Sequence, residues 1–325
     1  MRKMPGGTSS KLSGAKSAQL LTLGLFAVMC VVFAFLSPVF LTSGNLLNIA
    51  RQTAMLAIMC FGMVVVLIAT GGEADMSIAG VTGFASGVVV TLLARGASTF
   101  VAIVAALAAG TASGLLNGML VTKIGLLPFL ATLATSNMAQ GLEQVLTKGT
   151  AVAFSDPFIA HLANGDTLGI PTSLFLVLGV FLVFYVVLDH TGIGRRLYAV
   201  GGNPQVARMA GVDVDMYKTM AFVVAGLCSG IAGIVLMGRL SGLTPLAATH
   251  MHLDVLLAGY VSTVLSTVGA PGIFGALFGA VLVGTLTNGL AVIRVPTFYV
   301  NLVKGLLIIV VVAANAIQRR RRRSA

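Results

Sequence analysis

Three charged residues lie at the start of long apolar runs or within them, and carboxylate and ammonium groups in such places can pair with each other or bind a proton, an ion or a polar solute. Asp75 precedes one run, Asp254 begins another, and Lys304 lies inside the last one. Lys304 follows Pro296 by about eight residues, which places it roughly 12 Å into that run at 1.5 Å per helical residue. Because an ammonium at such depth costs about 2.5–3.5 kcal/mol in a bilayer, Lys304 should face the protein interior and find a partner. Asp254 is the predicted partner of this buried ion pair, and direct contact with a solute is the alternative.

Asp75 belongs to the polar segment Gly-Gly-Glu-Ala-Asp-Met-Ser at residues 71–77. Its carboxylate can cap a helix that starts at Met76, with Ser77 in the first turn. Alternatively, the segment breaks a span and lines a polar path, since irregular backbone at membrane depth survives only where protein or water surrounds it.

Uncharged polar residues also lie within apolar runs. They can present amide and hydroxyl groups to a hydroxyl-rich solute, or they can join helices to one another. These residues are Asn117, Thr132, Ser136, Asn137, Thr287 and Asn288.

One longer polar stretch, residues 190–211, separates two apolar blocks. Asn203 can cap a helix whose first residue is Pro204, and Gly211 suits the left-handed turn that ends it. The pattern predicts a helix over residues 204–210, with Gly201 and Gly202 as a flexible approach. Because isolated helices shorter than roughly 12 residues are marginal in water, this helix needs a partner surface.

The sequence holds no catalytic or metal-binding constellation. No Gly-x-x-x-x-Gly-Lys-Ser/Thr or His-Glu-x-x-His pattern occurs, and Cys30, Cys60 and Cys228 lack metal-ligand spacing. We therefore expect no enzyme activity, no metal and no cofactor bound by this chain. If ATP drives its function, the ATPase is another chain.

The composition requires these residues to be positioned by membrane-spanning helices. Hydrophobic residues make up 57% of the 325 residues and charged residues only 9%, with a mean hydropathy of +1.02. Since a crossing helix needs about 20 mostly apolar residues, the chain is predicted to be an all-α polytopic membrane protein with about ten transmembrane helices. The predicted spans are 20–40, 52–70, 76–93, 99–121, 126–143, 172–188, 218–237, 253–268, 272–293 and 297–316.

Lys and Arg in the loops predict the orientation, because their excess stays on the cytoplasmic side. The expected organisation is a cytoplasmic N-terminal segment (1–19), a transmembrane domain (20–317) and a basic cytoplasmic tail (318–325). A loop at 190–217 would be cytoplasmic, and one at 146–170, with a short helix over residues 158–164, external. The net charge of +11 sits at loop edges and in the tail, which indicates contact with anionic lipid and not with nucleic acid.

The stretch from Thr191 to Gly211 resembles the cytoplasmic coupling loop of the permeases of ribose-type sugar ABC importers, which belong to the branched-chain amino acid/ribose permease superfamily. By this resemblance the ATPase-coupling residues are Gly194, Arg195, Tyr198, Gly201, Gly202, Asn203, Pro204, Ala207, Arg208 and Gly211.

Other segments match the family in the same order along the chain: 71–77, Asn117-Gly118, 127–133, 169–171 and 288–290. By position, Asp75, Ser77, Asn117, Thr132 and Asn288 are candidates for the translocation pathway. Departures occur at Ala79, where the family usually has Gly, and at residues 263–266, which replace a Gly-Gly-Thr-Ser-type run. They leave the class intact and put the substrate in question.

The resemblance implies the ABC importer permease architecture in a bacterial inner (plasma) membrane, with both termini cytoplasmic. A second permease copy or a paralogue would complete the dimer, a cytoplasmic ABC ATPase would use ATP and Mg²⁺, and a periplasmic binding protein would deliver a pentose or related sugar. Two alternatives remain open. One is an autonomous ion- or proton-coupled secondary transporter that uses Asp75, Asp254 and Lys304, and the other is an amino-acid ABC permease.

Overall fold

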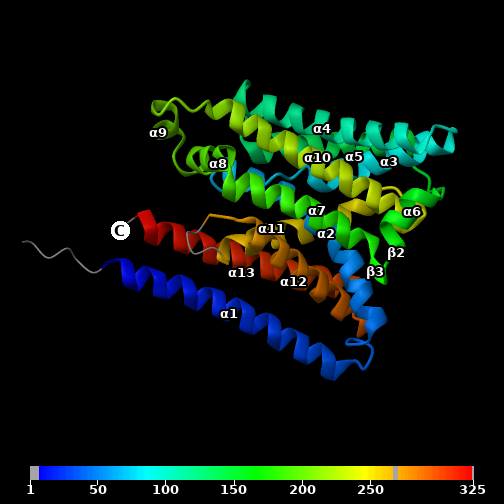
Figure 1. Ribbon diagram of the computed structural model, residues 1–325, viewed down its shortest axis with the longest axis horizontal. Coiled ribbons are helices and arrows are strands. Elements are labelled where there is room, and N and C mark those ends of the chain that lie inside the picture. Colours follow the sequence, from blue (N-terminus) through cyan, green and yellow to red (C-terminus); the bar gives the residue numbers. More distant parts are fainter. Residues whose placement is uncertain (1–6, 266–269, 324–325) are drawn as a thin grey trace, which may run out of the picture.

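The computed structural model describes residues 7–265 and 270–323, and nearly all of its regular structure is helical (Figure 1). Each of the ten predicted spans overlaps one helix, which confirms the all-helical fold class. These helices are α1 (Gly7–Leu36), α2 (Ser43–Ala69), α3 (Ile78–Ala94), α4 (Thr99–Thr122), α5 (Pro128–Thr147), α7 (Thr172–Tyr185) with its π-helical extension η1 (Val186–His190), α10 (Val214–Leu240), α11 (His252–Val264), α12 (Ile273–Val292) and α13 (Thr297–Arg323).

Short elements fill the connections. They are α6 (Pro157–Asn164), α8 (Gly192–Gly202), α9 (Pro204–Met209) and the 3-10 helix η2 (Ala247–Met251). Two small antiparallel pairs also form, β1 (Val152–Ala153) with β4 (Gly242–Leu243) and β2 (Asp166–Thr167) with β3 (Ile170–Pro171). Parts of three predictions lie outside the described residues: residues 1–6 of the N-terminal segment, residues 266–268 of the eighth span and residues 324–325 of the tail.

Not every predicted span is long and apolar enough to cross a bilayer by itself. Among the described residues, α2, α4, α7 with η1, α10 and α12 meet that requirement. The helices α3 and α11 are shorter, and each follows a segment that is not α-helical, residues 70–77 and η2. Such backbone is tolerated at membrane depth where protein surrounds it, so tertiary packing completes these two elements.

The long helix α10 runs from one end of the bundle to the other (Figure 1). The coupling-loop end carries α8 and α9, which precede α10 in the chain, together with the start of α1 and the end of α13. The opposite end carries α6, β2 and β3. The helices thus run alternately between the two ends (Figure 1).

Helix α2 forms the centre of the molecule, because 94% of its most apolar stretch is buried. Helix α10 packs against it and against α4. At the α4–α10 crossing the backbones meet directly: a Cβ at Gly114 would overlap the carbonyl of Phe222, and one at Gly226 would overlap that of Gly110. Small residues at such crossings let membrane helices approach closely.

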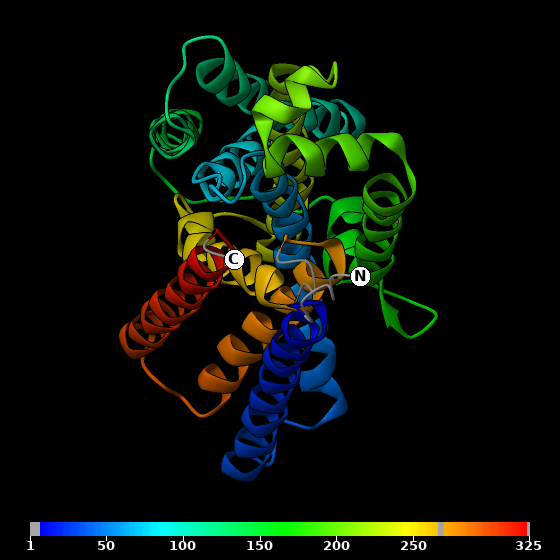
Figure 2. The ribbon, with the colours of Figure 1, turned by 90° about the vertical axis from the view of Figure 1, so that its left-hand side faces the viewer.

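The first helix lies at the periphery of the bundle (Figure 2). Its outer face is apolar, and Phe35 is 87% exposed. Large apolar side chains such as Leu302 of α13 are likewise exposed. An outer surface of this kind suits contact with lipid tails.

Candidate functional site

The polar loop between α7 and α10 folds into two short helices at the coupling-loop end. The helix predicted over residues 204–210 is confirmed as α9, which ends one residue earlier than expected, at Met209. The Asn203 side-chain oxygen accepts the backbone N–H groups of Gln205 and Val206, both at 3.1 Å. Gly211 has φ +78°, the left-handed conformation that ends the helix.

The interpretation of Gly201 and Gly202 as a flexible approach is wrong, because both residues belong to α8. A Cβ at Gly201 would overlap the carbonyl of Ile68 near the end of α2, and one at Gly194 would overlap that of Leu188 in η1. Close approach of α8 to the bundle, and not freedom of the chain, requires these glycines. Gly202 has open space around it.

Sequence reasoning missed α8, although its pattern was readable. The Thr191 side-chain oxygen accepts the N–H of Ile193 at 3.1 Å and caps the helix. The buried residues Gly194, Leu197 and Val200 then recur every third position, as one face of a helix requires.

The outer face of α9 is exposed and partly apolar. Met209 is 82% exposed and Val206 53%, whereas Ala207 is buried beneath them. Arg208 pairs with Asp215 of α10 at 3.0 Å, with both side chains largely in solvent. Arg195 is also exposed, on α8. The two short helices therefore present methionine, valine and arginine to a partner.

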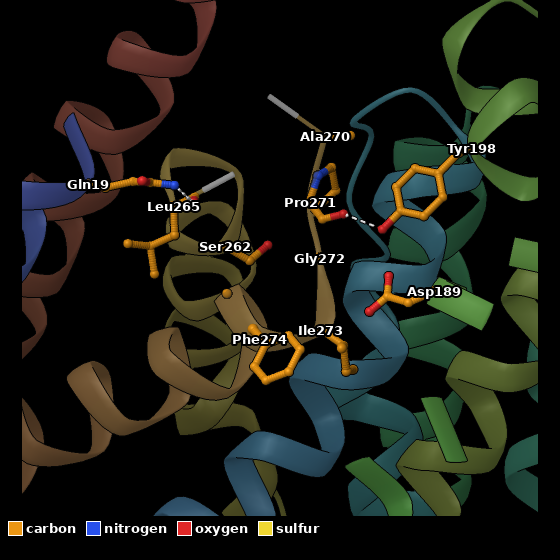
Figure 3. A pocket seen from close by; sticks show the side chains of 11 residues that line it. Gln19, Asp189, Tyr198, Ser262, Leu265, Ala270, Pro271, Gly272, Ile273 and Phe274 are labelled. Carbon is orange, nitrogen blue, oxygen red and sulfur yellow. Dashed lines mark hydrogen bonds between the residues drawn. The ribbon is translucent and has the colours of Figure 1, made fainter. Parts of the chain in front are cut away.

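Tyr198 points away from this face and into the bundle. Its hydroxyl donates to the carbonyl of Pro271 at 3.0 Å and so links α8 to the connection before α12 (Figure 3). Burial, with a smaller contribution from the negative charge of Asp189, raises the pKa of Tyr198 to about 12. The hydroxyl thus stays protonated, and remains a donor, at every pH that the protein meets. A cavity of about 540 Å³ lies beside this contact, and Gln19, Asp189 and Phe274 are among the residues that line it.

Buried hydrogen bonds join three of the five pathway candidates, Asp75, Ser77 and Asn117, and the fourth, Thr132, bonds the backbone of the same segment. Both the backbone N–H and the hydroxyl of Ser77 donate to Oδ1 of Asp75, at 2.7 and 2.6 Å. The Asn117 amide donates to the Ser77 hydroxyl at 2.8 Å. The Thr132 hydroxyl accepts the N–H of Met76 at 3.0 Å. This Asp75 network joins the segment before α3 to α4 and α5.

The local structure around Asp75 differs slightly from the prediction. Helix α3 begins at Ile78, with Ser77 as its N-cap residue, and not at Met76. Asp75 still bonds the N–H of Ser77, so the carboxylate fixes the turn that leads into the helix. Among the described residues, no Lys, Arg or His forms an ion pair with Asp75.

The fifth candidate, Asn288, lies elsewhere. It exchanges two amide hydrogen bonds with Asn45, at 3.0 and 3.1 Å, and Asn45 also donates to the carbonyl of Phe40. This pair joins α2 to α12, and sequence reasoning missed Asn45. Its partner lies 243 residues away along the chain, so no local pattern could have indicated the pair.

Lys304 and Asp254 meet at the opposite end of the bundle. The Lys304 Nζ lies 2.6 Å from Asp254 Oδ1, and the two side chains are 5% and 11% exposed. Sequence reasoning did not single out Arg239 of α10, which lies beside this pair. Among the described residues, no three His, Cys, Asp or Glu side chains gather in a way that would hold a metal ion.

Comparison with known proteins identifies the class of the chain. Residues 45–312 match the family described as branched-chain amino acid transport system / permease component. The ribose import permease protein of Bacillus subtilis (strain 168) is 35% identical over 88% of this chain and 89% of its own. That of Escherichia coli (strain K12) is 34% identical over 87% and 88%, and the D-allose transport system permease protein of the same strain 30% over 89% and 88%.

No solved structure matches the chain. The family match covers, wholly or in part, nine of the ten helices that overlap predicted spans, all except α1, and both short helices α8 and α9. The relatives agree with the resemblance that the motifs carried. The chain therefore belongs to the branched-chain amino acid transport system permease family, as a multi-pass membrane component of a transport system.

Proposed function

We propose that this chain is the permease subunit of an ATP-binding cassette importer that carries a pentose or a related monosaccharide. The observation that carries the proposal is the exposed α8–α9 surface, which packs on the membrane helices through its inner face. On its outer face, Val206 and Met209 are left exposed by the described residues. Relatives named as ribose and allose permeases support the substrate class.

Each end of the bundle would bind a different partner protein. A cytoplasmic ABC ATPase, which uses ATP and Mg²⁺, would dock on α8 and α9. A periplasmic sugar-binding protein would dock at the opposite end, where the Asp156 carboxylate caps α6 through the N–H groups of Phe158 and Ile159. A second permease copy or a paralogue would complete the pathway. The membrane would be the bacterial inner membrane, with both termini cytoplasmic.

Two contacts would carry motion from the ATPase into the bundle. Gly201 lies directly against the end of α2, and Tyr198 holds the connection before α12. A displacement of α8 would therefore move α2, the central helix, and α12 together. The pathway would open when these helices shift against α4, α5 and α3.

A pull-down of the tagged chain in mild detergent, with mass spectrometry of the bound proteins, tests the docking surface. Wild type should retain an ABC ATPase, and Val206→Asp/Met209→Asp should lose it because a buried carboxylate in the interface is costly. Leu168→Asp is the matched control: Leu168 is 93% exposed at the opposite end, so this variant should retain the ATPase. Failure of the wild type to retain any ATPase would contradict the proposal.

A secondary transporter would behave differently. Its uptake would collapse with the proton gradient while ATP is maintained, whereas uptake by the importer would continue. An amino-acid permease, which the family description admits, would show uptake that branched-chain amino acids inhibit and monosaccharides do not.

A further inference from the structure

A cavity of about 320 Å³ lies at the opposite end of the bundle, between α2, α10, α11, α12 and α13. This volume is at the small end of the range for ligand pockets, roughly 300–1,000 Å³. We name it the opposite-end cavity. Its polar lining includes Gln52, Arg239, Asp254, Thr287, Asn301 and Lys304.

Two buried donors in this lining have no hydrogen-bond partner. They are Nη1 of Arg239 and Oγ1 of Thr287, two of the nine buried side-chain atoms without a hydrogen-bond partner among the described residues. Asp254 Oδ1 is a third in this lining, and it is held by the ion pair with Lys304. Buried polar atoms are nearly always paired, because an unpaired one loses its bond to water and gains nothing in return. Unpaired atoms also occur elsewhere in the molecule, but these two belong to residues that border a cavity, where a solute can approach them.

Arg239 also has a like charge, and not an opposite one, as its neighbour among the described residues. Its neighbour Arg51, which repels it, is paired with Asp166 at 2.6 Å. Arg239 itself takes part in none of the ion pairs among the described residues. Its guanidinium is thus free to donate to oxygen atoms in the cavity.

The Lys304–Asp254 pair supplies both a donor and an acceptor on the same cavity wall. An ammonium carries three N–H donors, and a carboxylate offers about four acceptor positions, so one contact between them exhausts neither. A hydroxyl group, which donates and accepts at once, can bridge such a pair. Met55, Met251 and Val300 add apolar surface beside these groups.

We propose that the opposite-end cavity binds one polyhydroxylated solute of monosaccharide size. The ring oxygens and hydroxyls would meet Arg239, Thr287, Lys304 and Asp254, and a C–H face of the ring would pack on the apolar part of the lining. This inference rests on the proposed function, since it names where within the permease the transported sugar is held.

The test begins with uptake by cells that express the complete importer, over a panel of monosaccharides that includes ribose and D-allose, the sugars named for the relatives described above. The sugar that is taken up then serves as the probe. Absence of uptake for every monosaccharide would contradict the proposed function itself, and this inference with it.

The binding measurement uses thiol labelling of the assembled importer in membranes. The reporter is Asn301→Cys, because Asn301 is exposed and lines the cavity. The control is Thr244→Cys, an exposed position at the same end that does not line it. Both are made with Cys30→Ser, since Cys30 is only half-buried whereas Cys60 and Cys228 are buried.

The transported sugar should slow labelling at position 301 by a membrane-impermeant thiol reagent at least about twofold, as half-occupancy requires, and should leave position 244 unchanged. Adding Thr287→Val should weaken this protection. Equal labelling of position 301 with and without a sugar that the same importer takes up would overturn the inference while leaving the proposed function standing.

Discussion

Two buried polar clusters in this molecule differ in where their polar groups find hydrogen-bond partners. The Asp75 network pairs its carboxylate with Ser77 and draws on Asn117 and Thr132 from two further helices. The Lys304–Asp254 pair instead borders a cavity in which Arg239 and Thr287 keep unpartnered donors. The Asp75 carboxylate is bonded within the described chain and fixes the backbone, although Oδ1 of Asn117 has no partner there. The cavity lining instead leaves donors that a solute can bond.

The difference separates structural from transport roles among residues of similar type. Burying a polar group is costly unless it is hydrogen-bonded, so each residue can be judged by where its bonds go. Variants that remove internal bonds should cost stability, and variants that remove unpartnered groups should cost binding. Four changes test this contrast, from the largest expected effect on stability to the smallest.

Lys304→Met should destabilise the protein most, by about 3–5 kcal/mol, because it leaves Asp254 buried without its partner. The yield of folded protein and its thermal unfolding in detergent measure the effect. The exchange Asp254→Lys/Lys304→Asp should recover folding and still reduce sugar uptake, since the cavity wall has changed. If the exchange does not recover folding, Lys304 and Asp254 do not act only as an ion pair.

Asp75→Ala should destabilise by about 1–3 kcal/mol, because the buried donors of Ser77 lose their acceptor. Asp75→Asn keeps Oδ1 and should stay close to wild type in both unfolding temperature and uptake. Were Asp75→Asn as stable as wild type but inactive, the negative charge would serve transport, and the structural assignment of this network would be wrong.

Asn288→Leu should cost about 0.6–1.7 kcal/mol, between the average and the largest value found for hydrogen bonds between membrane helices. It removes the bonds to Asn45 that join α2 to α12. The order in which different sugars compete for uptake should not change, because Asn288 does not line the opposite-end cavity. A changed order of competition would instead indicate that Asn288 belongs to the translocation pathway.

Thr287→Val should not lower the unfolding temperature, because the hydroxyl has no hydrogen-bond partner among the described residues and its burial is costly. The sugar concentration that half-protects the thiol of Asn301→Cys should rise about two- to tenfold, the effect of one hydrogen bond. Thr285→Val, on the same helix but outside the cavity lining, is the matched control and should leave that concentration unchanged.

The local structure of the coupling loop could be predicted in part. The cap at Asn203, the first-turn position of Pro204 and the turn at Gly211 depend on neighbours within a few residues, so the sequence indicates them directly. Helix α8 was missed because its two terminal glycines favour a loop by propensity. Its contact with Ile68 of α2 overrides that preference, and no local pattern records such a contact.

The sequence by itself determined the class of the protein and the positions of its ten apolar helices, because hydropathy and helix caps act over neighbouring residues. It also limited the partners of Lys304, since a buried charge needs an opposite one. Only the tertiary structure decided that Asn117 bonds Ser77 while Asn288 bonds Asn45, and that Arg239 and Thr287 share a cavity. Helical periodicity orients a side chain about its own axis, whereas the face that it meets depends on how distant helices pack.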